Sequence, residues 1–68
     1  MLHMETITLQ LLDGDAVSTW IGIPAGTLAQ WRYLGKGPAY VKVGKHVRYR
    51  RSDVESWLDA QTRGGDAA

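Results

Sequence analysis

The spacing of apolar residues along the chain predicts two short helices, a β-hairpin and a last helix. Apolar residues recur at near-helical intervals from Leu12 to Ile21. Asp13 is a good N-cap, and Gly22 is a good terminating residue because glycine readily adopts a positive φ. The pattern therefore predicts a first helix over about Gly14–Ile21.

A second helix is predicted over about Pro24–Leu34. Pro24 suits its first position, since proline has its φ preset and needs no amide donor there. Leu28 and Trp31 lie three residues apart on its buried stripe, and the run 35–38, which contains two glycines and a proline, ends it. Two short helices joined by a glycine-containing turn are typical of a helix-turn-helix, whose second helix can enter the DNA major groove.

A β-hairpin is predicted next. Two runs with alternating side chains, 40–43 and 46–49, form its strands, and Gly44 and Lys45 between them have the form of a type II′ turn. We expect one face of the hairpin to be apolar and to pack on the helices, and the other to be basic. The apolar face consists of Val41, Val43 and Val47, and the basic face of Lys42, His46, Arg48 and Arg50. Such a wing is what contact with DNA requires.

The end of the chain predicts one more helix. Ser52 and Glu55 form a capping box, with Ser52 at the N-cap, so the helix covers about Asp53–Ala60. Three tryptophans lie on apolar helical stripes, and we expect them in the core rather than stacked on bases; they are Trp20, Trp31 and Trp57. The prediction is a small α+β winged helix-turn-helix over residues 11–60, with an extended lead-in (1–10) and a flexible tail (61–68).

The distribution of charge along the chain indicates what kind of ligand the protein binds. Seven of the eight Lys and Arg residues lie between Arg32 and Arg51, a stretch without Asp or Glu, while both flanks are acidic. The net charge of +1 therefore hides a dense cationic strip. Such a strip suits a phosphate polymer, which it attracts at long range and which releases counterions on contact. If about four to six of these cations touch phosphate, log K falls with log salt at a slope of roughly −4 to −5.

The composition does not support other kinds of site. With no cysteine and two histidines, the chain is not expected to bind a metal or a cofactor. Asp13 and Asp15 begin like a calcium loop, but the remaining ligands are absent, so N-capping is the better interpretation. Paired carboxylates, a glycine-rich phosphate loop and a nucleophile with its base are also absent, so we do not expect an enzyme. The sequence has neither a membrane span nor a signal peptide, which favours a small cytosolic module.

A longer constellation of residues links these elements to a known family. It comprises Leu12-Asp13, Val17, Ile21-Gly22-Ile23, Thr27-Leu28, Trp31-Arg32, the run 35–39, the wing turn Val43-Gly44-Lys45 and the segment from Arg48 to Leu58. This order resembles the small winged-helix domains of phage excisionases, which are related in fold to the DNA-binding part of MerR-type regulators. The resemblance covers about residues 11–60. Its most specific parts are the wing turn and the final segment.

The resemblance implies a function and partners. Excisionases bind and bend double-stranded DNA at attachment-site repeats and steer phage integrase toward excision, in the cytoplasm of the bacterial host. The implied partners are therefore that DNA and the integrase. Because the chain is small and has no leucine-rich dimer helix, we expect a monomer in solution. Several copies would then assemble head-to-tail on closely spaced repeats, with acidic residues of one copy facing the basic wing of the next.

The resemblance also implies where DNA is contacted: by the second helix in the major groove and by the wing tip at phosphates or the adjacent minor groove. The recognition-helix residues are then Ala25, Gly26, Thr27, Ala29, Gln30, Arg32 and Tyr33. The wing residues are Lys42, Lys45, His46, Arg48 and Arg50.

These residues have different expected roles. The family usually has Ser or Thr at the position of Pro24 and long polar or basic residues where Ala25, Gly26 and Ala29 stand. Base reading therefore depends mainly on Gln30, which can pair with adenine, together with the wing and DNA deformability.

Other side chains on or beside the same face are assigned to the backbone. Arg32 is expected on a phosphate, and His46 near phosphate rather than as a pH sensor. Tyr33 would reach the groove or a phosphate. The hydroxyl of Thr27 would meet a phosphate or cap the first turn.

Two alternatives remain open at this stage. A phage or prophage transcriptional regulator can share the same fold, because architecture does not fix the biological output. A protein-interaction adaptor would instead use the basic wing on an acidic partner. A steep salt effect on DNA binding separates a DNA-binding protein from the adaptor.

Overall fold

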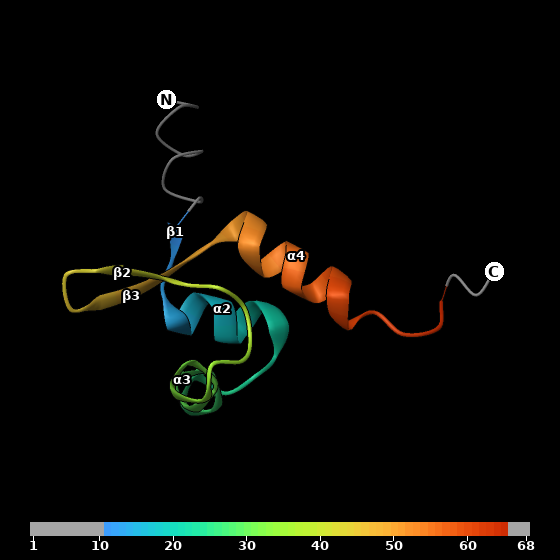
Figure 1. Cartoon of the computed structure of the whole chain (residues 1–68), viewed down its shortest axis with the longest axis horizontal. Coiled ribbons are helices and arrows are strands. Elements are labelled where there is room, and N and C mark those ends of the chain that lie inside the picture. The colour runs from blue at the N-terminus through green and yellow to red at the C-terminus, as the bar shows by residue number, and fades with distance from the viewer. Residues whose placement is uncertain (1–10, 66–68) are drawn as a thin grey trace, which may run out of the picture.

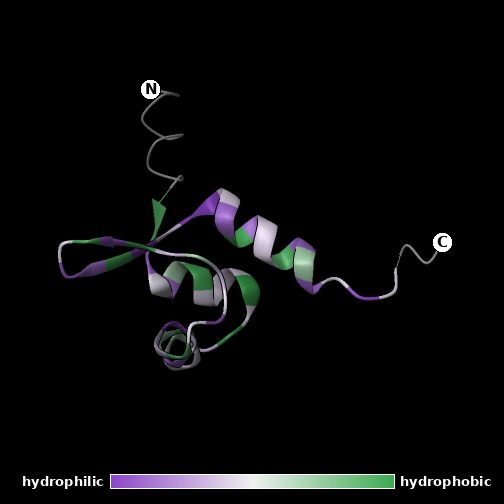
Figure 2. Cartoon of the chain, viewed as in Figure 1, coloured by the Kyte–Doolittle hydropathy of each residue, from purple (hydrophilic) through white to green (hydrophobic). Residues whose placement is uncertain are grey.

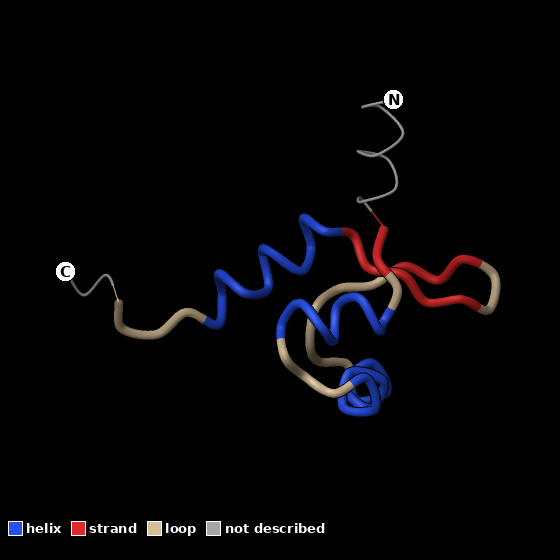
Figure 3. The backbone as a smooth tube through the Cα atoms, turned by 180° about the vertical axis from the view of Figure 1, so that it is seen from behind, coloured by secondary structure: helices blue, strands red, loops and turns tan. Residues whose placement is uncertain are grey.

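The computed structural model describes residues 11–65, and it forms a small α+β winged helix-turn-helix as predicted (Figure 1). The predicted lead-in, 1–10, and the last three residues of the predicted tail lie outside the described residues. Elements follow in the order β1 (Leu11–Leu12), α2 (Gly14–Ile21), α3 (Ala25–Leu34), β2 (Val41–Val43), β3 (His46–Arg50) and α4 (Arg51–Gln61). The β2–β3 hairpin projects to one side of the molecule and α4 extends to the other (Figures 1 and 3).

Helix α2 begins and ends where the sequence predicts. The Asp13 carboxylate Oδ1 accepts a hydrogen bond from the Ala16 amide at 2.8 Å, which satisfies one of the free donors of the first turn. Gly22 terminates the helix with φ 75°, and its amide donates to the Ser18 carbonyl. Both ends of α2 are therefore fixed by the residue types that predicted them.

The start of α3 differs by one residue from the prediction. Pro24 is the N-cap rather than the first helical residue, with an extended ψ of 144°. Its carbonyl accepts hydrogen bonds from the amides of Thr27 and Leu28 at 3.0 and 3.1 Å. The preset φ of proline fits the N-cap as well as the first turn, so the residue signals the start without fixing its register. Gly35 ends α3 in the left-handed conformation, as predicted.

The sheet has one more strand than the predicted two-stranded wing. Its order is β1-β3-β2, with both pairs antiparallel. Leu11 and Leu12 of β1 lie opposite Arg50 and Tyr49. A two-residue strand leaves no periodic signal, which is why the sequence placed these leucines only at the start of the domain.

The predicted faces of the hairpin are wrong. Gly44 has φ 64° and no described non-glycine residue has a positive φ, in agreement with the expected type II′ turn. This two-residue turn pairs Val41 with Arg48, Lys42 with Val47 and Val43 with His46. Residues directly opposite each other share a face, so basic and apolar side chains mix on both sides.

The two faces can now be assigned by their position on the fold. The helix-facing side carries Lys42, Val47 and the buried Tyr49. The outer side carries Val41, Val43, His46, Arg48 and Arg50. The mixed colouring of the hairpin in Figure 2 shows the same alternation.

Helix α4 starts without the predicted capping box. It begins at Arg51, and Arg50 is the N-cap with no side-chain hydrogen bond. Strand β3 stays paired with β1 up to Arg50 and passes into the helix without a loop, so the helix starts before Ser52. Glu55 accordingly turns toward Arg51, with 3.5 Å between its Oε2 and the Arg51 Nε, instead of capping the helix.

The buried core consists of four side chains rather than the three tryptophans: Val17, Leu28, Tyr49 and Val54. Trp20 is 40% exposed, so its predicted burial is wrong. Trp31 and Trp57 are half-buried and contact each other, with ring centroids 5.6 Å apart. Sequence spacing places a tryptophan on the inward half of a helix, but the ring is too large for the small interior and remains at its edge.

Gly37 supports this packing through a close approach to Trp31. It has φ 87°, and a Cβ atom added there would lie 2.9 Å from Trp31 Cε3. We expect Gly37→Ala to lower the free energy of unfolding by about 1–3 kcal/mol, because it adds both backbone strain and a clash. Urea unfolding measures the change. Gly14→Ala is the matched control, since nothing lies within 4 Å of its added Cβ, and an equal loss in both variants would contradict the argument.

Candidate nucleic-acid interface

One face of α3 is exposed on the surface of the described protein. Leu28 is buried on the inner side, whereas Gly26, Ala29, Gln30 and Tyr33 are all exposed. Ala29 and Gln30 lie three and four residues after Gly26, and Tyr33 lies four and three residues after them, so the four share one stripe along the helix. Tyr33 is 89% exposed, the largest value among the exposed large hydrophobic residues. The structure thus brings most of the predicted recognition residues onto one outward face.

The first turns of α3 carry only small side chains on this face. Ala25, Gly26 and Ala29 are exposed, and a Cβ added to Gly26 would meet nothing within 4 Å. Gly26 has no positive φ, so neither backbone conformation nor packing requires glycine there. Small side chains let the α3 backbone approach a flat or grooved partner closely, and they leave Gln30 and Tyr33 as the long side chains of the stripe.

Two predicted recognition residues do not lie freely on this face. Thr27 is half-buried, and its hydroxyl makes no hydrogen bond within residues 11–65, so the capping alternative is not observed. Arg32 is also half-buried, and its Nη1 donates to the hydroxyl of Tyr49 at 2.7 Å. The side chain expected on a phosphate therefore contacts the protein core.

The wing carries cations on both of its sides. Lys45 stands at the turn and is exposed, with Lys42 on the helix-facing side and His46 on the outer side. Arg48 lies further back on the outer side, where it is half-buried and donates from Nη1 to the Val47 carbonyl at 2.8 Å. Most of the positive charge of the wing therefore lies near its tip, on both faces of the hairpin.

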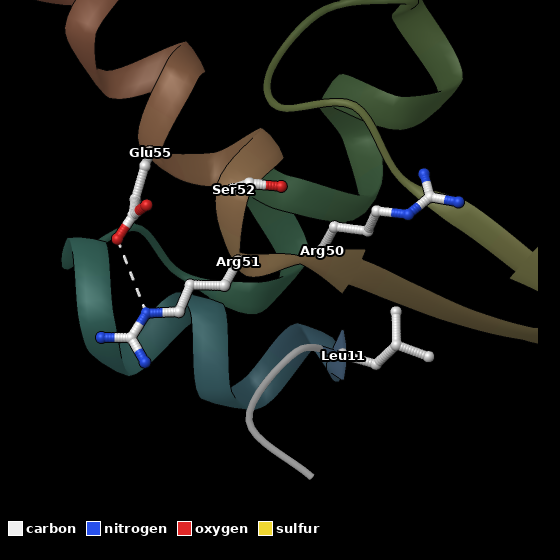
Figure 4. A pocket seen from close by; sticks show the side chains of 5 residues that line it. All are labelled: Leu11, Arg50, Arg51, Ser52 and Glu55. Carbon is white, nitrogen blue, oxygen red and sulfur yellow. Dashed lines mark ion pairs between the residues drawn. The ribbon is translucent and has the colours of Figure 1, made fainter. Parts of the chain in front are cut away.

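Two cations of the strip belong to a different surface. Arg50 lies 3.6 Å from the Asp53 carboxylate, and Arg51 pairs with Glu55 (Figure 4). The Arg51–Glu55 pair is exposed and Asp53 is half-buried, so both pairs contribute little to stability, but each places a negative charge beside the arginine. Within the described residues, the continuous cationic strip of the sequence is thereby divided, with unpaired lysines on the wing and at Lys36, and ion-paired arginines at the start of α4.

Two hollows with mixed polar and apolar linings lie beside these pairs, and the sequence did not predict them. One hollow is lined by Leu11, Arg50, Arg51, Ser52 and Glu55, and a second by Leu12, Ala16, Trp20 and Arg51. Arg51 is common to both, so the two hollows adjoin. Leu11 and Trp20 are 44% and 40% exposed. The sequence contained no signal for these hollows, because they depend on strand β1, which it did not predict.

Comparison with known families agrees with this geometry. Residues 11–62 match the family model described as a helix-turn-helix domain, which covers all the elements given above. The chain belongs to the helix-turn-helix domain family. This is a family of DNA-binding domains and not typically of enzymes, so DNA is the indicated ligand. No individual curated protein matches the chain significantly.

Two further features of residues 11–65 bear on the site. No helix there is long and apolar enough to cross a membrane. No three or more His, Asp or Glu residues gather closely enough in that part of the chain to hold a metal ion.

Proposed function

We propose that this protein is a phage excisionase, which binds and bends double-stranded DNA at attachment-site repeats and directs integrase-mediated recombination toward excision. The observation that carries the DNA-binding part is the outward stripe of α3 beside a wing with exposed cations. The excisionase part is supported by the resemblance of the wing turn and of the segment from Arg48 to Leu58. Such a protein would act in the bacterial cytoplasm, where its DNA lies.

In this proposal α3 enters the major groove and the wing follows the backbone beside it. Gln30 reads a base edge, and the small residues Ala25, Gly26 and Ala29 let the helix approach closely. Tyr33 and Thr27 would contact the groove wall or a phosphate. Wing contacts to phosphate come from Lys42, Lys45, His46 and Arg48, with a smaller share from the paired Arg50.

The salt dependence of DNA binding tests the electrostatic part. Within residues 11–65, four cations of the strip make no ion pair and no contact to a tyrosine: Lys36, Lys42, Lys45 and Arg48. Four phosphate contacts correspond to a slope of log K against log salt of about −3.6, at the shallow end of what four to six contacts would give. Fluorescence anisotropy with a labelled duplex, titrated from low to high salt, measures it. A slope near zero would contradict DNA binding through these cations.

Gln30 is expected to carry sequence preference rather than general affinity. A bidentate contact to adenine is worth about 1–3 kcal/mol of discrimination, so Gln30→Ala should reduce the ratio of selected-site to random-DNA affinity roughly five- to hundred-fold. Duplexes selected from a random library provide the probe. Lys36→Ala is the control, because loss of an exposed cation should weaken both DNAs alike. If the two variants change the ratio equally, Gln30 does not read a base.

The integrase contact is proposed on the hollows around Arg51. These lie by β1 and the start of α4, whereas α3 lies on the opposite side of α2 (Figures 1 and 3). Exposed Leu11 and Trp20 there are available while α3 is in a groove. Excisive recombination in vitro, with integrase and attachment-site DNA, tests the proposal. The transcriptional-regulator alternative would leave recombination unchanged and alter transcription from a nearby promoter.

Several copies are proposed to act together on the repeats. A single α3 with mostly small side chains gives few base contacts, so neighbouring copies would add affinity through contacts between an acidic surface and a basic wing. Asp15 and Asp59 are exposed and make no ion pair within residues 11–65. Gel-shift titrations on one, two and three repeats distinguish cooperative assembly from independent binding. The adaptor alternative predicts no binding to any of these duplexes.

A further inference from the structure

Three side chains tie helix α3 directly to the wing. Arg32, in the last turn of α3, donates its hydrogen bond to the hydroxyl of Tyr49 in β3. Its guanidinium carbon also lies 5.9 Å from the ring centroids of both Tyr49 and Tyr40, the residue just before β2. The two tyrosine rings are 6.3 Å apart and tilted by 58°. Arg32 therefore contacts the base of the hairpin at β3 and at the residue that leads into β2.

We propose that Arg32 is a positioning residue, which fixes the distance and angle between α3 and the β2–β3 wing and so sets the spacing at which the two meet DNA. The proposal rests on the DNA-binding function proposed above. It replaces the phosphate contact expected for Arg32 with a role inside the protein. Lys36, just beyond α3, is then the exposed cation at this end of the helix.

Few other contacts join α3 directly to the sheet, apart from Leu28, which packs with Tyr49 in the core. Helix α3 packs mainly on α2, and α2 in turn packs on β3, so the helix reaches the sheet largely through an intermediary. The segment that joins α3 to β2 contains Gly35 and Gly37, both with positive φ. In contrast, Tyr49 is 0% exposed and belongs to the core, so its hydroxyl is a fixed point. A hydrogen bond to that point restrains α3 where the covalent connection is glycine-rich.

The chemistry of the contact requires arginine. A guanidinium is planar, so it can donate to the hydroxyl and lie against an aromatic ring at once, whereas a lysine ammonium is a strongly hydrated point charge. The tyrosine hydroxyl, if left without a partner, would be a buried polar group at a cost. Arg32→Lys retains the positive charge but loses the planar guanidinium. Tyr49→Phe retains every cation but loses the hydroxyl that accepts the hydrogen bond. These two variants therefore distinguish a role of Arg32 in positioning α3 from a role of its charge in DNA binding.

The first test compares DNA binding by Tyr49→Phe, Arg32→Lys and Arg32→Ala, each first checked for folding by circular dichroism. The probe is a duplex selected by the wild-type protein from a random library, together with copies that carry one base pair inserted between the helix and wing footprints. We expect about a tenfold loss on the selected duplex in all three variants, with a reduced penalty for the insertion. The salt slope should stay that of wild type. Lys36→Ala, the matched control, should make the slope shallower by about 0.9 and keep the full insertion penalty.

Other results would overturn the proposal. If Arg32 contacts phosphate, Arg32→Ala will weaken selected and random DNA equally and change the salt slope, while Tyr49→Phe binds like wild type. The double variant Arg32→Ala/Tyr49→Phe should bind no more weakly than either single variant, since both remove one interaction. Additive losses would contradict the proposed contact.

A second measurement does not depend on DNA. Residual dipolar couplings of the α3 and wing amides should fit one alignment tensor in the wild-type protein and two different tensors in Tyr49→Phe. A single tensor in both proteins would overturn the positioning role, whatever the DNA result. If the wild-type protein selects no duplex but its dipolar couplings change as expected, the proposed function fails and the positioning of α3 by Arg32 stands as a property of the fold.

Discussion

Replacing Tyr49 with alanine should leave the chain mostly unfolded at 25 °C. Tyr49 is fully buried and packs with Val17, Leu28 and Val54, and it also accepts the hydrogen bond from Arg32. Removing a buried aromatic ring typically costs about 3–5 kcal/mol. A core in a chain of this size rarely supplies more than about 3–5 kcal/mol in total, so the loss matches the whole stability. Far-UV circular dichroism and urea titration measure the folded fraction.

Tyr40→Ala is the matched control for this prediction. The residue type is the same and its ring contacts Tyr49, but Tyr40 is 43% exposed. We expect a loss of about 1 kcal/mol, since surface aromatic pairs contribute on that scale. Equal destabilisation of the two variants would show that the aromatic pair, rather than burial of Tyr49, holds the fold together.

Removing both lysines of the wing should have the largest effect on DNA affinity. Lys42 and Lys45 are exposed and unpaired within residues 11–65, so Lys42→Ala/Lys45→Ala removes two proposed phosphate contacts. The salt slope should become shallower by about 1.8, and affinity in 0.1 M salt should fall roughly fifty-fold. Selected and random duplexes should lose equally, because phosphate contacts carry no sequence information. Anisotropy titrations at several salt concentrations provide both numbers.

Arg51→Ala/Arg63→Ala is the matched control, since it removes the same charge from outside the wing. Arg51 is paired with Glu55, and Arg63 follows α4. This variant should bind within about threefold of wild type with nearly the same slope, because only cations at the contact release counterions. Similar losses in both double variants would mean that net charge, and not the position of the wing lysines, governs binding.

The sequence predicted the elements well where a single residue type fixes the local backbone. Asp13 and Gly22 placed both ends of α2, and Gly44 placed the hairpin turn. Pro24 and Ser52 were less informative, because each residue type is compatible with more than one position at a helix start. Helix α4 in particular begins early because it continues directly from a paired strand, and that pairing involves Leu11, far away in the sequence.

The faces of the hairpin could have been predicted correctly from the turn alone. A two-residue loop pairs Val43 with His46, so an odd-numbered residue of one strand shares a face with an even-numbered residue of the other. Grouping Val43 with Val47 ignored that rule. By contrast, no sequence rule could show that Arg32 turns inward, since its partner Tyr49 is seventeen positions away and its burial depends on the whole core.

The mixed faces of the hairpin have a consequence for the kind of DNA that the protein would prefer. A wing inserted between the two phosphate backbones that border a minor groove would present Lys42 to one and His46 to the other. Both contacts can form at once only if the backbones stand close together. A·T-rich tracts have the narrowest minor groove and the most negative potential within it. The wing would thus bind best where the minor groove is narrow. It would then favour certain DNA sequences through their groove width, without a side-chain contact to their bases.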